Sequence, residues 1–135
     1  MAIIDGARGL LYWSFGEKGL AWMKDPRERE QKWAELVRIT REIKALEPVL
    51  LAPDVAVVSR ESSNGAVRTL GKAADGARYL FAYNTRNTPT RVTWTLAAPA
   101  TETFDLASGR AGPRIESDSI TAELGAYEVR RLRIR

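Results

Sequence analysis

The chain has 135 residues, of which 44% are hydrophobic and 28% charged, and its formal net charge is +4. This length and composition predict a globular chain with one domain, or one small domain with an appendage. The sequence contains no cysteine and no histidine, which excludes disulfides, Ser-His-Asp and Cys-His catalytic groups and the usual zinc sites. No stretch approaches the ~20 apolar residues of a membrane-spanning helix, and residues 1–6 lack the basic start of a signal peptide.

The first 48 residues have the pattern of one β/α unit. Residues 9–15 form a continuous apolar and aromatic run between Gly9 and Gly16, which is typical of a strand buried on both faces in a parallel sheet. Residues 2–7 before it fit the last turn of a helix that ends at Gly6. A single β/α unit cannot bury its own strand, so this segment is expected to need a partner.

A long amphipathic helix is predicted over residues 26–47. Asp25 is a suitable N-cap, Pro26 suits the first helical position, and Glu28 stands three residues after the cap. Pro48 is predicted to end the helix, because the residue before a proline disfavours helical geometry. An apolar stripe follows at three- and four-residue steps: Trp33, Leu36, Val37, Thr40, Ile43 and Leu46.

From residue 49 onwards the hydrophobic pattern has a period of two, which is typical of strands. Turn signals such as Asn64-Gly65 and Asp75-Gly76 separate the alternating runs. Short strands with turns every ~8–12 residues predict an antiparallel β-sandwich. The predicted fold class is therefore mainly β, with a sandwich over residues 49–135 preceded by one β/α unit with a single long amphipathic helix.

Two details of the sandwich follow from the same alternation. The apolar residues stand at odd positions up to Val129 and at even positions from Leu132, which a β-bulge near residues 130–131 would explain. Most of the strand aromatics are predicted to be core residues, and an exposed platform for sugars could come from one face only: Tyr79, Phe81, Tyr83, Trp94 and Phe104.

The order of these elements resembles the C-terminal end of a glycoside hydrolase, in which a (β/α)8 barrel is followed by a small antiparallel β-sandwich. Residues 6–16 resemble the last barrel strand and residues 25–47 the eighth barrel helix. Residues 79–84 and 91–96 are similar to a pair of strands of the terminal sandwich, and residues 102–106 with 108–110, then 122–129, to its closing strands. The resemblance implies that residues 1–48 are the remnant of the last β/α unit of the barrel and that residues 49–135 form a structural sandwich.

The resemblance also implies a sugar-binding role for three residues. Trp13, at the end of the last barrel strand, would stack its indole on a sugar ring. Glu17 and Trp22 would line the same cleft, because active sites lie at the C-terminal ends of barrel strands. The alternative is that all three are ordinary core, interface or loop residues. In the resembling enzymes the catalytic carboxylates lie on the fourth and seventh strands, so they would lie outside this chain.

Neither a catalytic pair nor a metal site is predicted within the chain. Asp5 and Glu17 flank a strand more than ~20 Å long, whereas the two carboxylates of a glycosidase stand ~5–9.5 Å apart. Asp75, Asp105 and Asp118 lack the clustered spacing of a calcium loop. No catalytic residue, metal or cofactor is therefore assigned.

The sequence thus predicts a non-catalytic C-terminal portion of a glycoside hydrolase. Its partner would be the remainder of the barrel or, in isolation, a second copy of the chain, because the strand and the helix stripe would otherwise be exposed. A free-standing carbohydrate-binding sandwich is the first alternative. The second is a basic nucleic-acid-binding protein, which the arginines of residues 130–135 suggest and a steep salt dependence of binding would reveal.

Overall fold

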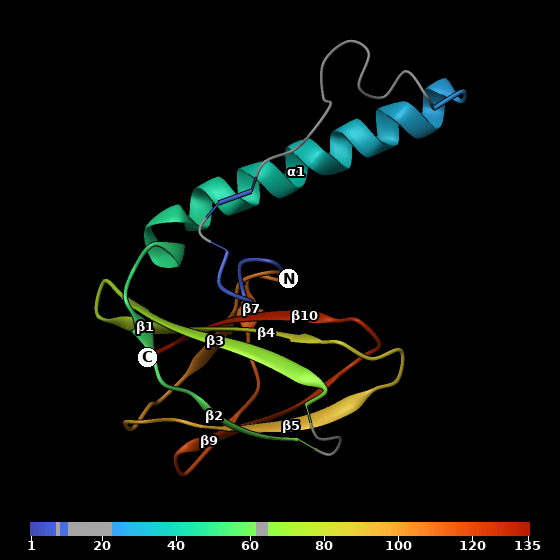
Figure 1. Ribbon diagram of the computed structural model, residues 1–135. Helices are drawn as coiled ribbons and strands as arrows, with labels where there is room; N and C mark the ends of the chain where they lie inside the picture. Colours follow the sequence, from blue (N-terminus) through green and yellow to red (C-terminus); the bar gives the residue numbers. More distant parts are fainter. Residues whose placement is uncertain (8, 11–22, 62–64) are drawn as a thin grey trace.

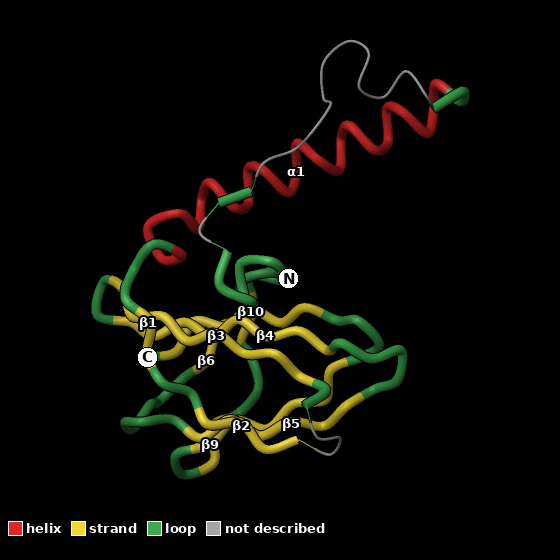
Figure 2. Tube along the Cα trace, viewed as in Figure 1, coloured by secondary structure: helices red, strands yellow, loops and turns green. Residues whose placement is uncertain are grey.

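A computed structural model describes residues 1–7, 9–10, 23–61 and 65–135 of the chain. It consists of a long helix, α1 (Pro26–Leu50), followed by two antiparallel β-sheets that face each other. Figure 1 shows the helix on the outer side of the sandwich, with one end against a sheet and the other pointing away from it. The same arrangement, coloured by secondary structure, is seen in Figure 2.

The two sheets contain all the strands of the described chain, and neighbouring strands within each sheet pair antiparallel. The larger sheet has the order β1-β3-β4-β10-β6-β7 and the smaller one β2-β5-β9-β8. The predicted mainly β fold, an antiparallel sandwich preceded by a single helix, is therefore confirmed. The strands of the larger sheet are β1 (Asp54–Val55), β3 (Val67–Ala74), β4 (Ala77–Asn84), β6 (Thr103–Asp105), β7 (Arg110–Ala111) and β10 (Val129–Ile134). Those of the smaller sheet are β2 (Val58–Glu61), β5 (Thr90–Thr95), β8 (Ile115–Glu116) and β9 (Ser119–Leu124).

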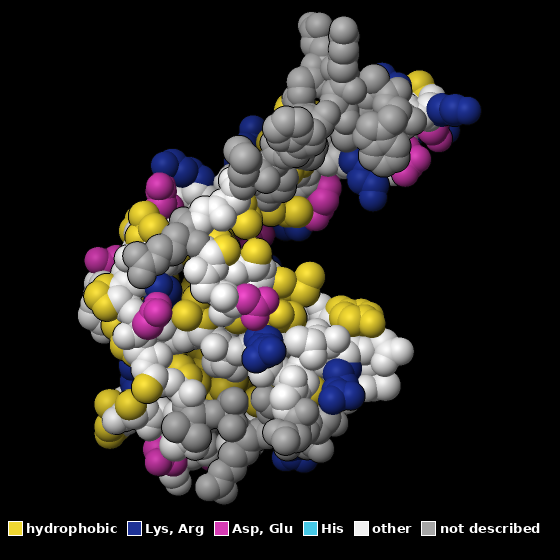
Figure 3. All heavy atoms as spheres, viewed as in Figure 1, with side chains coloured by type: hydrophobic (Ala, Val, Ile, Leu, Met, Phe, Trp, Pro, Cys, Tyr) yellow, Lys and Arg dark blue, Asp and Glu magenta, His cyan; other side chains and the backbone are white. Residues whose placement is uncertain are grey.

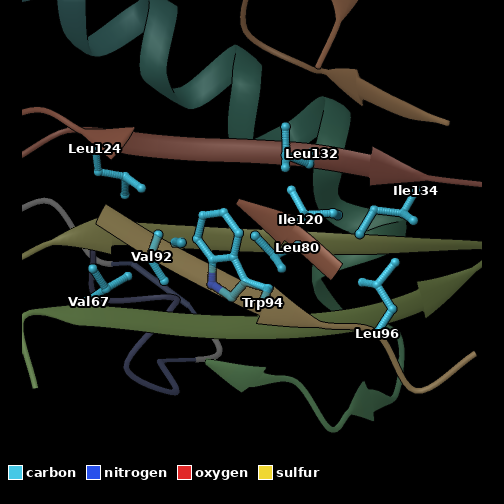
Figure 4. Packing of buried hydrophobic residues seen from close by; sticks show 10 residues of the cluster. Val67, Leu80, Val92, Trp94, Leu96, Ile120, Leu124, Leu132 and Ile134 are labelled. Atoms are coloured by element: carbon cyan, nitrogen blue, oxygen red, sulfur yellow. The ribbon is translucent and has the colours of Figure 1, made fainter. Parts of the chain in front are cut away.

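The main core lies between the two sheets, as Figure 4 shows. Its largest side chain is Trp94 of β5, which is fully buried and whose Nε1 donates a hydrogen bond to Thr69 Oγ1 at 3.1 Å. Alternation along the strands brings the other members inward from both sheets. They are Val67, Leu80, Ala82, Val92, Leu96, Ile120, Leu124, Leu132 and Ile134.

A second, smaller core lies on the outer face of the larger sheet. Tyr79 and Phe81 of β4 point to this face and pack with Val49 at the C-terminal end of α1. Leu46 and Leu50 of the helix pack against the same cluster. The burial predicted for the aromatic residues of β4 and β5 is thus confirmed, but the β4 aromatics pack against the helix and not between the sheets.

The helix begins where the sequence predicts and ends later. Asp25 caps it, since its Oδ1 accepts a hydrogen bond from the Arg27 N–H at 2.8 Å. The predicted end at Pro48 is wrong, because Pro48 lies inside α1, which continues to Leu50. The proline removes one backbone donor, yet the Leu51 N–H still bonds to Glu47 O at 3.0 Å. Packing of Val49 and Leu50 on the sheet explains why the last turn persists.

Phe104 is 44% exposed and is the exception among the five strand aromatics, most of which were predicted to be core residues. In the short strand β6 the inward position belongs to Thr103, which is buried, and alternation turns Phe104 outward. α1 covers β4 at this face through Tyr79 and Phe81, whereas Phe104 stays accessible. The sequence could not show this, because it does not specify which part of the outer face the helix covers.

The predicted bulge near residues 130–131 is also wrong. The register between β10 and β4 is continuous from Val129↔Tyr83 to Ile134↔Arg78. The apolar residues change from odd to even positions for another reason. Tyr127 lies before the strand, in a turn conformation with a φ of 55°. Val129 is the first residue of the strand and faces outward, with 39% of its surface exposed. Leu132 and Ile134 alone of these four apolar residues point into the core.

The described residues of the N-terminal segment lie near the helix and the larger sheet. Residues 2–6 form a hydrogen-bonded turn, with Ile4 N–H bonded to Met1 O at 2.8 Å and Gly6 at a φ of 99°. Gly9 and Leu10 are not in a strand; the rest of the strand predicted over residues 9–15 lies outside the described residues. The division into a barrel remnant and a sandwich therefore stays a prediction. No helix that the structure describes is long and apolar enough to cross a membrane.

Candidate functional site

The three residues expected to contact sugar, Trp13, Glu17 and Trp22, lie outside the residues that the structure describes. Their role therefore stays a prediction. The described residues do form a distinct feature, a groove beside the C-terminal half of α1. This groove is the candidate site among the described residues.

The groove has a volume of about 860 Å³ and lies between three parts of the chain. One wall is α1, the second is the N-terminal segment of residues 3–10, and the third is the edge of the larger sheet at β1 and β3. Figure 3 shows apolar side chains gathered where the helix meets the sandwich. This volume falls within the ~300–1,000 Å³ of sites that hold small molecules or large side chains. The apolar lining residues include Ile3, Leu10, Ile43, Leu50, Leu51, Pro53 and Leu70.

Lys72 of β3 carries a buried positive charge into this groove, where it is only 9% exposed. Its Nζ lies 2.6 Å from Asp54 Oδ1 and donates a hydrogen bond to Ala52 O at 2.8 Å. Asp54 pairs with Lys72 in the β1–β3 register, so the ion pair joins residues directly opposite each other. The contact holds the edge strand β1 in place and neutralises the lysine.

The described groove offers no free carboxylate for acid–base chemistry. Glu47, which lines the groove, forms an ion pair with Lys44, and Asp54 forms one with Lys72. Glycoside hydrolysis requires two carboxylates with separate roles on either side of the scissile bond. The carboxylates that line the described groove are thus each paired with a lysine, and the rest of its lining is largely apolar.

A polar bridge holds the helix to the sheet beside the groove. The Glu42 carboxylate of α1 forms an ion pair with Arg131 of β10, and its other oxygen lies 3.3 Å from Arg38 Nη1. Burial lowers the pKa of the Arg131 guanidinium, and the charge of Arg38 lowers it further. Glu35 also pairs with Arg38, at 2.7 Å, and this hydrogen bond lowers the pKa of the exposed Glu35 carboxyl.

The N-terminal segment is held to the same face by Asp5. Its Oδ2 accepts a hydrogen bond from the Tyr83 hydroxyl at 2.7 Å. That bond, together with burial and the negative charge of Asp5, raises the pKa of Tyr83, against a smaller opposing effect of Arg68. Asp5 therefore has a structural partner, and Glu17, with which a catalytic pair was considered, lies outside the described residues.

Only the C-terminal part of α1 contacts the second core. Residues 26–35 are all exposed, and Figure 2 shows this end of the helix extending away from both sheets. At 1.5 Å per residue, these ten residues reach about 15 Å beyond the rest of the helix. The predicted apolar stripe continues into this end, with Trp33 49% exposed.

No group of three or more residues suited to hold a metal ion occurs in the described ranges. Sequence reasoning named Thr40 and Ile43 of the groove as part of the helix stripe but missed its charged residues. Lys72 and Asp54 are eighteen positions apart, and only the β1–β3 register brings them together. The charge bridge between Glu42 and Arg131 depends on a helix packed on a sheet, for which a single sequence contains no local signal.

No family model and no curated protein matches this chain. Among solved structures, the chain is similar to Gan42B, a GH42 β-galactosidase, with 20% identity and a TM-score of 0.41 over 82% of this chain. A catalytic mutant of Gan42B from G. stearothermophilus gives a TM-score of 0.40 at the same identity and coverage. The chain spans only 13% of the length of these enzymes. Because TM-scores this low do not establish a common fold, neither fold nor function is derived from the similarity.

Proposed function

We propose that this chain is the C-terminal portion of a glycoside hydrolase, in which the sandwich is structural and the catalytic carboxylates lie elsewhere in the enzyme. The order of elements supports this proposal: an apolar run, a long helix and an antiparallel sandwich follow each other as in the resembling barrel enzymes. Trp13, Glu17 and Trp22 would then contact sugar in the intact enzyme. The barrel would be the partner of the first 48 residues.

The packing of α1 is the observation that carries the proposal. The helix uses only its C-terminal part to cover the larger sheet, through Leu46, Val49 and Leu50. Its first ten residues extend into solvent, which burial of the sandwich alone does not require. A helix of 25 residues, about 37 Å long, is longer than the contact it makes here. Such a helix suits a position between the sandwich and a second body.

The groove supports the same arrangement. Its apolar lining faces outward beside the helix, and exposed apolar surface of this kind marks interaction sites. Arg41 and Lys44 stand among the lining residues, so the surface that covers the groove is expected to combine apolar side chains with acidic ones. In the proposed enzyme this surface belongs to the barrel.

The size of the native protein tests the proposal directly. An antibody against this chain should detect, in the source cells, a band several times larger than the 15.0 kDa of the chain. The immunoprecipitated protein should hydrolyse glycosides, whereas the purified 135-residue chain should not. A native band at 15.0 kDa, or hydrolysis by the purified chain alone, would contradict the proposal.

Self-association of the purified chain provides a second test. A chain separated from its barrel should form dimers through the groove and the helix stripe, as measured by light scattering after size-exclusion chromatography. Ile43→Glu, which places a charge in the groove, should shift the chain toward monomer. Lys32→Glu, on the exposed part of α1, is the control and should leave the dimer intact. A wild-type chain that is monomeric at all concentrations would count against an exposed docking surface.

A further inference from the structure

A small hollow lies on the outer face of the larger sheet, away from the groove. Its volume is about 130 Å³, and it is lined by Glu102 and Phe104 with Arg133 and Arg135. Phe104 of β6 stands directly opposite Arg133 of β10 in the strand register. Two backbone hydrogen bonds of 3.1 and 3.2 Å make Glu102 and Arg135 the next facing pair. The hollow is thus a square of four outward-facing side chains from two adjacent strands.

The two arginines of this square differ in their partners. Arg135 Nη1 lies 3.6 Å from Glu102 Oε1, so its charge is balanced within the hollow. Arg133 has a buried Nε without a hydrogen-bond partner. No carboxylate of the described residues lies within ion-pair distance of its guanidinium.

A partly buried guanidinium without an acceptor is costly, since buried donors are nearly always hydrogen-bonded. Arg131, on the same strand and face, also has a buried Nε without a partner, but its Nη1 forms an ion pair with the carboxylate of Glu42. Arg133 occupies the equivalent position two residues further on, and its acceptor has to come from outside the described chain. The guanidinium fork matches a carboxylate best, because both are planar and can form two parallel hydrogen bonds.

The neighbours of Arg133 restrict the ligand further. Glu102 places a negative charge in the hollow, which disfavours a doubly charged phosphate relative to a singly charged carboxylate. Phe104, 44% exposed beside the arginine, offers an apolar ring face suited to the C–H face of a sugar or to an aliphatic chain. The hollow is smaller than sites that enclose a whole ligand, so it would take one group and leave the ligand body on Phe104.

We propose that Arg133 and Phe104 form a binding site for a carboxylate attached to a C–H-rich body, such as that of a sugar acid. Arg133 binds the carboxylate, Phe104 contacts the body, and Glu102 excludes dianions. The site is independent of the groove and does not rest on the proposed function. The same chemistry would also fit an acidic side chain of a protein partner, and the probes below separate these two sources.

A titration of the full 135-residue chain with glucuronate, followed by NMR chemical shifts of the backbone amides, tests the site. Shifts are expected at β6 and β10 around Phe104 and Arg133. Glucose, which lacks the carboxylate, should give none, and phosphate should bind at least tenfold more weakly than glucuronate. Binding of glucose and glucuronate with equal affinity, shifts located elsewhere, or no shift at tens of millimolar glucuronate would overturn the proposal.

Acetate distinguishes the two sources of the carboxylate. If glucuronate binds more tightly than acetate, the body of the ligand contributes through Phe104, as expected for a sugar acid. If acetate binds equally well at the same residues, the arginine alone recognises the group, and an acidic side chain is the better match. The first result supports the proposal as stated; the second retains Arg133 and overturns the role of Phe104.

Two variants and a control assign the roles of the side chains. Arg133→Gln should weaken glucuronate binding at least tenfold, because a charged hydrogen-bond donor is lost. Phe104→Leu, a change at an exposed position, should weaken glucuronate but not acetate, and it remains informative if Arg133→Gln fails to fold. Arg110→Gln makes the same change of charge on the exposed strand β7 and should bind as the wild type does. Equal loss in Arg110→Gln and Arg133→Gln would show that only net charge matters.

Discussion

Glu42 of α1 and Arg131 of β10 form an ion pair that connects the helix to the outer face of the larger sheet. The two side chains are about a quarter exposed, at 30% and 23%, so water screens the pair less than it screens a surface salt bridge. The pair lies beside the apolar contact of Leu46, Val49 and Leu50 with β4. Polar and apolar contacts thus act together to set the position of the helix.

Glu42→Gln is expected to lower the free energy of unfolding by about 1–2 kcal/mol. The substitution keeps the shape of the side chain but leaves the guanidinium of Arg131, which is largely buried, without its counter-charge. Urea denaturation followed by circular dichroism measures the change. Glu35→Gln is the matched control, because Glu35 pairs with Arg38 on the exposed side of the helix and such pairs contribute little. Equal losses in both variants would show that the ion pair with Arg131 of β10 stabilises the chain no more than an exposed pair on the helix does.

The contact of Asp5 with Tyr83 predicts a loss of stability at alkaline pH. The hydrogen bond to Asp5, burial and the negative charge of Asp5 raise the pKa of Tyr83 in the folded chain. The folded state therefore keeps a proton that the unfolded chain releases near pH ~10. The stabilisation is fully present below that pH and is lost as the pH rises through the higher folded value.

Tyr83→Phe should remove this part of the pH dependence and lower the free energy of unfolding at neutral pH by about 1 kcal/mol. Unfolding curves measured from neutral pH to above the tyrosine range test both statements. Asp5→Asn, which keeps a polar partner but removes the charge, should give an intermediate slope. If the wild type and Tyr83→Phe lose stability in parallel, Asp5 does not control this tyrosine.

A glycine is required at position 71 of β3 because β1 and the residue Val57 approach the backbone closely there. A Cβ at this position would lie 2.5 Å from Val57 Cγ2 and 2.6 Å from the Val55 carbonyl oxygen. The backbone oxygen cannot move without disturbing β1, which pairs with β3 at Gly71. Gly71→Ala is therefore expected to destabilise the chain by about 1–3 kcal/mol, measured by thermal denaturation. Gly9→Ala, where a Cβ meets nothing within 4 Å, should be close to neutral.

Substitution by leucine should change the free energy of unfolding strongly at Trp94 and only slightly at Phe104. Trp94→Leu empties part of the core and removes the indole donor of Thr69, so a loss of about 3–4 kcal/mol is expected. Phe104→Leu changes an exposed side chain and should alter the free energy of unfolding by no more than about 0.5 kcal/mol. A large loss in Phe104→Leu would contradict the exposed position of this residue.

Much of the fold could be predicted because its signals are local. The N-cap Asp25 and the alternation that buries Trp94 each depend on a few neighbouring residues. The end of α1 and the parity change before Leu132 depend on what packs against them, and the local pattern failed there. At the candidate site, Thr40 and Ile43 belong to the predicted helix stripe, but the contact of Asp54 with Lys72 was not predicted, since it joins positions far apart in the chain.

The sequence by itself determined the fold class, the place where the helix begins and the absence of cysteine and histidine chemistry, because period, capping and composition are properties of short segments. Only the tertiary structure decided that the helix rests on the outer face of the larger sheet. It also decided that Arg131 meets Glu42 while Arg133 meets no described carboxylate. The two arginines have the same alternation in the sequence. They differ because the helix passes over one of them and not the other, and the place where a helix crosses a sheet is set by the packing of the whole chain.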